Sequence, residues 1–278
     1  MNHKLRLAKL KFRRFRYLIK WFLQFKTNKI KPYQNMKEMN VDSVSKSLVL
    51  VPHADDEWIG NSQILRKTNA TAYYFQFLGN NYNQANKTIR RNELENLQKE
   101  INFDLIISDN YDDYSDLEKL ISTNNFTDVF IPFPVDWHEE HIKVNTIFHS
   151  ILSKLKKDFN LHFYHISVPL PIDIKGNYLA LSENETKYKH NIFSRIYQSQ
   201  YNTPISRLNY QLRLNAKNKN IFACENFAEL TFAEWTDLLE FVTQNYETRI
   251  KPLIYNIDDL ILIREKSNQI YQEWKMKN

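Results

Sequence analysis

Short apolar runs alternate with longer helical segments from Lys46 onward, and this alternation restricts the fold more than any other feature of the chain. The first run, Leu48–Val51, is apolar at every position, which is typical of a strand covered on both faces inside a parallel sheet. The strand-like runs are Leu48–Val51, Ala72–Leu78, Asp104–Ile107, Val129–Ile131 and Leu161–Ile166, and the helix candidates between them are Ile59–Lys67, Lys87–Glu100, Ser115–Ile121 and Glu140–Lys157. We therefore expect an α/β fold of the Rossmann-like kind, in which a mostly parallel sheet carries helices on both faces.

Residues 46–278 are expected to form one domain. Helical stretches near Glu183–Gln198, Phe232–Thr243 and Asp258–Lys275 extend the alternating part without a clear second domain. With 278 residues and 42% hydrophobic content, the chain is long enough to bury a sizeable core. The single cysteine, Cys224, fits a reducing compartment, and we see neither a bilayer-spanning apolar run nor a secretory signal. These features predict a cytoplasmic protein.

The N-terminal segment, residues 1–31, carries the excess of positive charge. It holds eleven Lys and Arg residues and no acid, whereas the remainder has 27 basic against 32 acidic residues, a net charge of −5. From Lys4 to Lys26, cations and apolar side chains follow three-and-four spacing, which predicts an amphipathic helix. Its apolar stripe comprises Ala8, Phe12, Phe15, Ile19 and Phe22. The polar residues 32–45 are interpreted as a linker.

This segment suggests a place for the protein in the cell. Cations beside an aromatic stripe suit the boundary between headgroups and acyl chains, so we expect residues 1–31 to bind an anionic membrane surface at its cytoplasmic face. The alternative is that the stripe packs on the net-acidic body of the chain or on a second subunit. A nucleic-acid-binding domain would carry its positive charge on the folded surface, so the confinement of the charge to this segment argues against such a partner.

Two clusters of metal-binding residue types follow predicted strands. The first, HADDE, occupies residues 53–57, and the second, DWHEEH, occupies residues 136–141. Ligands of open α/β sheets bind beyond the carboxyl ends of the strands, so both clusters are placed to form a site. Histidine and aspartate suit Zn²⁺ or Fe²⁺, and three protein ligands with an open position are typical of a catalytic site. His138 and His141 are three residues apart, whereas the zinc-protease helix motif needs four.

The two clusters resemble the paired motifs of the PIG-L or LmbE-like metal-dependent de-N-acetylases, approximately A-H-P-D-D-E and D-x-H-P-D-H. PHADDE and DWHEEH are separated by about eighty residues in this chain. Three weaker echoes follow in the expected order: Arg90-x-x-Glu93, Tyr197-x-Ser199-Gln200 and Glu225-x-Phe227. The resemblance covers residues 46–227 and implies the Rossmann-like fold of this family.

The resemblance also implies a role for each matching residue. His53, Asp56 and His141 match the ligands of a Zn²⁺ or Fe²⁺ ion. Asp55 matches the general base that deprotonates the metal-bound water, and His138 matches a residue that stabilises the oxyanion or protonates the departing amine. Arg90 and Glu140 are candidate substrate-binding residues.

The implied function is hydrolysis of the acetyl group of an N-acetylated amino sugar, with a lipid-linked sugar and a surface-glycan intermediate among the candidate substrates. Amide hydrolysis needs an activated water, stabilisation of a tetrahedral oxyanion and a proton for the leaving nitrogen. A divalent metal lowers the pKa of bound water to roughly 7 and polarises the carbonyl. The donor set of the two clusters agrees with these requirements.

Departures from the family pattern motivate a second hypothesis, a catalytically decayed fold that acts as a binding or scaffold protein. Ala54 replaces the usual proline, and Glu140 replaces the aspartate before the last histidine. The chain has only three glycines, so the glycine-rich turn after the first motif is reduced to Gly60. A metal-content assay separates the two hypotheses, because decay would leave the site unable to hold an ion.

Overall fold

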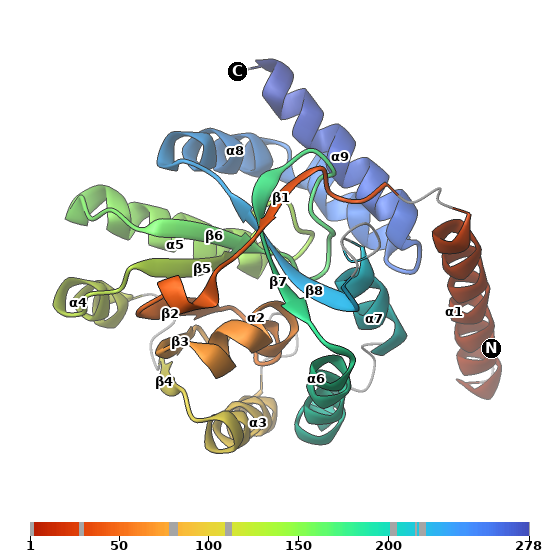
Figure 1. The fold of residues 1–278 in the computed structure, drawn as a ribbon, viewed down its shortest axis with the longest axis horizontal. Coiled ribbons are helices and arrows are strands. Elements are labelled where there is room, and N and C mark those ends of the chain that lie inside the picture. Colours follow the sequence, from red (N-terminus) through yellow and green to blue (C-terminus); the bar gives the residue numbers. More distant parts are fainter. Residues whose placement is uncertain are drawn as a thin grey trace.

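The computed structural model describes residues 3–27, 31–77, 83–108, 113–200, 205–214, 216 and 221–277. Its centre is an eight-stranded sheet in the order β1-β7-β8-β6-β5-β2-β3-β4 (Figure 1). The strands are β1 (Asn35–Glu38), β2 (Ser47–Val51), β3 (Ala70–Tyr74), β4 (Asp104–Ile107), β5 (Asp128–Pro132), β6 (Asn160–Tyr164), β7 (Lys175–Leu181) and β8 (Ala223–Glu229). The helices are α1 (His3–Lys26), α2 (Asp56–Lys67), α3 (Gln84–Ile101), α4 (Ser115–Thr123), α5 (Glu139–Leu155), α6 (Glu183–Ile196), α7 (Ile205–Arg213), α8 (Phe232–Gln244) and α9 (Leu260–Lys277).

The predicted α/β class is confirmed. Strands β2, β3, β4, β5 and β6 pair in parallel, and β1 is parallel to β7. Only β8 runs the other way, antiparallel to both β6 and β7. All five predicted strands are present, although β3 ends at Tyr74 and the predicted end at Leu78 lies outside the described residues. The sheet is therefore mostly parallel, with one antiparallel strand that the sequence did not reveal.

Residues 32–45, which we expected to be a linker, contain strand β1 and a short 3-10 helix, Val41–Ser43. Strand β1 pairs with β7 from Asn35 to Glu38 and so extends the sheet at one edge. Only Met36 of this strand is buried, because an edge strand buries little of its surface. Such a strand shows almost no apolar pattern, which explains why its sequence looked like a linker.

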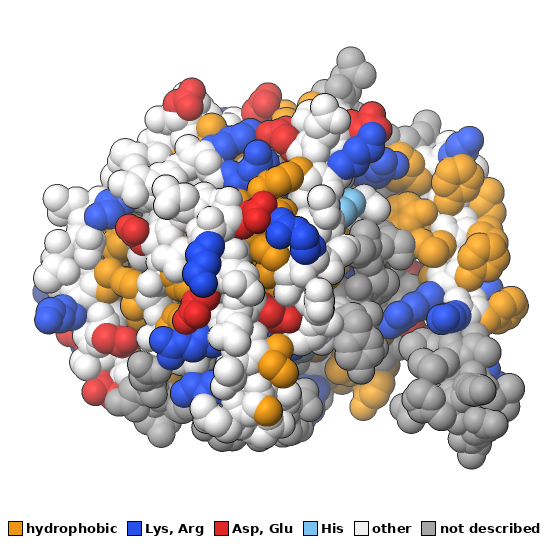
Figure 2. Space-filling model, turned by 90° about the horizontal axis from the view of Figure 1, so that it is seen from below, with side chains coloured by type: hydrophobic (Ala, Val, Ile, Leu, Met, Phe, Trp, Pro, Cys, Tyr) orange, Lys and Arg blue, Asp and Glu red, His pale blue; other side chains and the backbone are white. Residues whose placement is uncertain are grey.

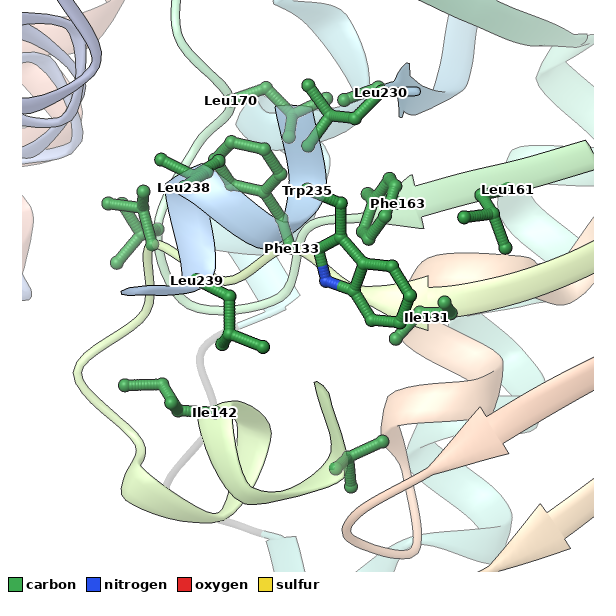
Figure 3. Packing of buried hydrophobic residues seen from close by; sticks show 14 of the residues in the cluster. Ile131, Phe133, Ile142, Leu161, Phe163, Leu170, Leu230, Trp235, Leu238 and Leu239 are labelled. Carbon is green, nitrogen blue, oxygen red and sulfur yellow. The ribbon is translucent and has the colours of Figure 1, made fainter. Parts of the chain in front are cut away.

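The sheet separates two hydrophobic cores because alternate side chains of each strand point to opposite faces. Leu48 and Leu50 of β2 belong to one core, together with side chains of α4, α5, α8 and α9. Val49 and Val51 belong to the other core, together with side chains of α2, α3 and α6. Figure 3 shows the first core around Trp235, where α8 packs on Ile131 of β5 and Phe163 of β6. Helices therefore cover both faces, as predicted (Figure 1).

Gly60 lets helix α2 lie against strand β6. A Cβ atom at this position would come within 2.3 Å of the ring of Tyr164. That ring has no room to move, because it is fully buried and its hydroxyl donates a 2.6 Å hydrogen bond to the carbonyl of Leu50. The glycine therefore supports the helix that carries the first motif.

We expect Gly60→Ala to lower the free energy of unfolding by about 1–3 kcal/mol, the usual cost of overpacking a filled core. Urea denaturation followed by circular dichroism measures this change. An unchanged midpoint would mean that α2 shifts without cost and that Gly60 is not needed for its packing.

Candidate active site

The two predicted clusters meet at the carboxyl ends of β2 and β5, which are neighbours in the sheet. From β2 the chain builds β3 and β4 on one side and then returns to place β5 on the other side. The order of the strands reverses at this point, and open α/β sheets bind ligands in the crevice that such a reversal leaves. The HADDE cluster links β2 to α2, and the DWHEEH cluster links β5 to α5. The topology thus brings together residues about 90 positions apart in the sequence.

Three side chains converge where β2 and β5 end. The Nδ1 atom of His53 lies 3.1 Å from Oδ2 of Asp56 and 3.2 Å from Nε2 of His141. The Nε2 atom of His141 lies 3.4 Å from the same Asp56 oxygen. Asp56 and His141 are buried, whereas the side chain of His53 is 21% exposed. These three residues are the ones that the resemblance matches to metal ligands.

The spacing of these donor atoms fits a metal ion. Zinc binds histidine nitrogen and carboxylate oxygen at roughly 2.0–2.2 Å in tetrahedral geometry, which places two ligand atoms about 3.3 Å apart. The three observed separations lie within 0.2 Å of that value. Two imidazole nitrogens and one carboxylate oxygen are also the mixed donor set that zinc and ferrous iron accept. The residues present therefore fit a divalent metal with at least one open position.

Asp136 fixes the orientation of His141. One of its oxygens, Oδ2, lies 3.2 Å from Nδ1 of His141, on the ring edge opposite the donor atom Nε2. Its other oxygen, Oδ1, accepts the backbone N–H of His138 at 3.0 Å. Burial alone would raise the pKa of Asp136, but His141 and His138 lower it, so the carboxylate stays charged. Carboxylates commonly orient metal-binding histidines in this way.

Glu140, a candidate substrate-binding residue from the sequence, directly precedes His141 in the chain. The Glu140 carboxylate is half-buried and makes no hydrogen bond or ion pair with any residue that the structure describes. Asp136 makes the contact with His141 instead. Asp136 is the first residue of the D-x-H pattern, and that pattern was the sequence signal for its contact with His141.

Asp55 lies beside the three donors without belonging to them. Its backbone has a φ of 131°, a left-handed conformation that non-glycine residues adopt at a cost. Its N–H donates a 3.0 Å hydrogen bond to Glu57, whose other oxygen accepts the hydroxyl of Tyr197. Burial, followed by the charge of Asp56, raises the pKa of Asp55 well above its usual range. The buried Tyr197–Glu57 pair thus holds the strained backbone of a carboxylate that can accept a proton.

His138 is placed next to two of the donors. Its ring centroid lies 5.5 Å from that of His53 and 4.9 Å from that of His141. Burial, followed by the charge of His141, lowers the pKa of His138 to about 4. A neutral imidazole at this position can donate one hydrogen bond.

Arg90 and the weaker echoes of the family pattern support the first cluster. Arg90 donates a 3.3 Å hydrogen bond to the carbonyl of Ala54, and Gln200 lies 3.4 Å from the same oxygen. Ser199 donates to both oxygens of Glu93 through its N–H and its hydroxyl. Arg90 is thus within reach of the site, although its observed contacts are with the protein.

Glu225 of the last echo supports helix α2. The helix leaves regular geometry at Asn61, which frees backbone donors in its interior. Glu225 accepts the N–H groups of Ser62 and Gln63 at 2.9 and 3.0 Å and pairs with the buried Lys189. Glu225 therefore supports the structure of α2, although it lies more than 160 residues after Ser62 in the chain.

Solved deacetylase structures share this fold. The zinc-inhibited form of teicoplanin deacetylase Orf2 superposes with a TM-score of 0.52 and 12% identity over 66% of this chain and 97% of that chain. The deacetylase Dbv21, which acts on the A40926 pseudoaglycone, gives a TM-score of 0.51 and 13% identity over 68% of this chain and 98% of its own. No protein-family model and no curated protein sequence matches this chain. The predicted Rossmann-like fold is therefore one that this chain shares with these two deacetylases.

Proposed function

We propose that this protein is a metal-dependent hydrolase that removes the acetyl group from an N-acetylated amino sugar and releases acetate and a free amine. The observation that carries the proposal is the set of three donor atoms 3.1–3.4 Å apart, with the buried carboxylate of Asp55 and the half-buried imidazole of His138 beside them. The fold shared with the teicoplanin and A40926 pseudoaglycone deacetylases agrees with this reaction.

His53, Asp56 and His141 would hold the ion. When bound, a divalent metal supplies Lewis-acid chemistry, which makes water more acidic and an amide carbonyl more electrophilic. The buried ligands and Asp136 keep the three donors aimed at one point.

Asp55 and His138 would perform the remaining steps. The water oxygen bonds to the amide carbon while Asp55 takes a proton from that water. The carbonyl oxygen thereby becomes an oxyanion. The neutral His138 ring donates a hydrogen bond to that oxyanion. When the carbon–nitrogen bond breaks, Asp55 returns its proton to the nitrogen, so the products are a carboxylic acid and an amine.

Incubation of zinc- or iron-loaded protein with a panel of N-acetylated amino sugars tests the proposal. We expect mass spectrometry to detect loss of one acetyl group from at least one sugar, and free acetate in equal amount. The Asp55→Asn protein is the matched control and should leave the panel unchanged. Protein that takes up no metal and turns over no member of the panel would favour the scaffold hypothesis instead.

A further inference from the structure

Helix α1 has an inner face that holds it to the body of the protein. Trp21 is buried, and its ring meets that of Tyr210 on α7 edge-to-face at a centroid distance of 5.0 Å. The Nζ atom of Lys20 lies 2.7 Å from Oδ2 of Asp259, and Arg13 pairs with Asp258. Helix α1 is therefore attached to α7 by an aromatic contact and to the residues just before α9 by ion pairs.

The outer face of α1 is apolar and exposed. Phe12, Phe15, Ile19, Phe22 and Leu23 are 45–64% exposed. Their spacing of three and four residues places them on one stripe of the helix, opposite Trp21. Figure 2 shows hydrophobic side chains gathered on α1 at the right of the molecule. An apolar patch of this size on a surface marks an interaction site.

Positive charge borders this stripe. At 100° per residue, Lys9 and Arg16 lie along one edge of the stripe and Lys11 along the other, and all three are exposed. Lys26 lies 5.0 Å over the ring of Phe22 at the end of the helix. No acidic residue occurs before Glu38. A partner for this face must therefore accept apolar side chains and cations together.

We propose that the outer face of α1 docks in the plane of an anionic lipid bilayer and that the substrate is an N-acetylated sugar presented there on a lipid. The aromatic and aliphatic side chains would enter the boundary between headgroups and acyl chains, and the flanking cations would meet lipid phosphates. A second copy of the helix would bring cation against cation along the stripe, so it complements this face less well. None of the helices that the structure describes has the length and apolar character of a membrane span.

The inner face of α1 is connected through α7 to the loop of the candidate active site. Arg14, Tyr17 and Trp21 line a cavity of about 50 Å³ together with Arg207 and Tyr210 of α7. The guanidinium of Arg207 lies 5.5 Å from the centre of the Trp137 ring, and Trp137 directly precedes His138 in the chain. These contacts run from the inner face of α1 to the loop that carries His138, so the helix that would meet the bilayer packs on the part of the chain that builds the site. The choice of a lipid-linked substrate rests on the proposed deacetylation.

Vesicle sedimentation tests the docking without any need for activity. We expect the full chain to bind vesicles of phosphatidylcholine and phosphatidylglycerol in equal parts more tightly than pure phosphatidylcholine, and less tightly as salt rises. The triple variant Phe12→Ser, Phe15→Ser, Phe22→Ser should lose at least about tenfold in affinity, because three apolar side chains no longer enter the bilayer. A matched control, Ile254→Ser, Tyr255→Ser, Met276→Ser, removes three other exposed apolar side chains and should bind as the unmodified chain does.

Equal binding by the two triple variants, or no binding by the full chain, would overturn the membrane proposal. A change from dimer to monomer in the α1 variant, without vesicle binding, would assign this face to a second copy.

The substrate class is tested separately with metal-loaded protein. The α1 variant should hydrolyse a soluble N-acetylated sugar at the normal rate but a vesicle-embedded one at least about tenfold more slowly. An equal loss of hydrolysis rate with both substrates would overturn the proposal of a lipid-linked substrate. Absence of any hydrolysis by the unmodified chain would reject the proposed function, but it would not affect the sedimentation result.

Discussion

His141→Ala is expected to abolish both metal binding and turnover. The substitution removes one of the three donor atoms that lie 3.1–3.4 Å apart. His141 is also buried between Asp56 and Asp136, so its loss leaves two carboxylates facing each other without the imidazole that separates them. Loss of supporting residues around a metal site already costs about 10–100-fold in affinity, and loss of a ligand should exceed that range. Metal content by mass spectrometry and calorimetric titration with Zn²⁺ measure the effect.

A matched control for this prediction is His149→Ala. His149 is a histidine of the same helix, α5, but it hydrogen-bonds Thr236 at 2.8 Å and stacks on Phe232, away from the crevice. This variant should keep one ion per chain. If the His141 variant also kept one ion with unchanged affinity, the assignment of the three ligands would be wrong.

The candidate site could be predicted from the sequence because its residues directly follow strands that are buried on both faces. Continuous apolar runs identified β2 and β5, and the two clusters began within a few residues of their ends. Parallel strands that are neighbours bring their carboxyl ends to one edge, so the convergence of His53 and His141 followed from the topology. What the sequence could not supply was the neighbour relation itself, which the structure gives through the pairing of β2 with β5.

Strand β8 shows why part of the sheet was missed. Six of its seven residues are buried, yet Glu225 and Asn226 interrupt the apolar pattern. Glu225 is tolerated there because Ser62, Gln63 and Lys189 surround its carboxylate. These partners lie far away in the sequence, so no local pattern distinguishes this buried carboxylate from an exposed one.

The orientation of His141 depended on geometry that spacing does not encode. Glu140 is adjacent to His141 in the chain, but successive residues of a helix point about 100° apart and do not face each other. Asp136 precedes the helix, and the loop between β5 and α5 folds its carboxylate back onto His141. The sequence alone therefore did not identify Asp136 as the neighbour of His141, and the strained backbone of Asp55 was equally invisible in it.

Asp55→Asn is expected to keep the metal and to lose most of the turnover. The three donor atoms that could hold an ion come from His53, Asp56 and His141, so removal of the Asp55 charge leaves the ligand set whole. Asparagine tolerates a positive φ and has the same shape, so the strained backbone at 131° and its hydrogen bond to Glu57 should persist. An amide cannot take a proton from water, and removal of a general base typically costs roughly 10²–10⁴ in rate. We therefore expect one bound ion per chain, an unchanged thermal midpoint and a fall in kcat of that size in the acetate-release assay. Loss of the ion together with activity would make Asp55 a ligand, and full activity would give the proton-accepting role to another group.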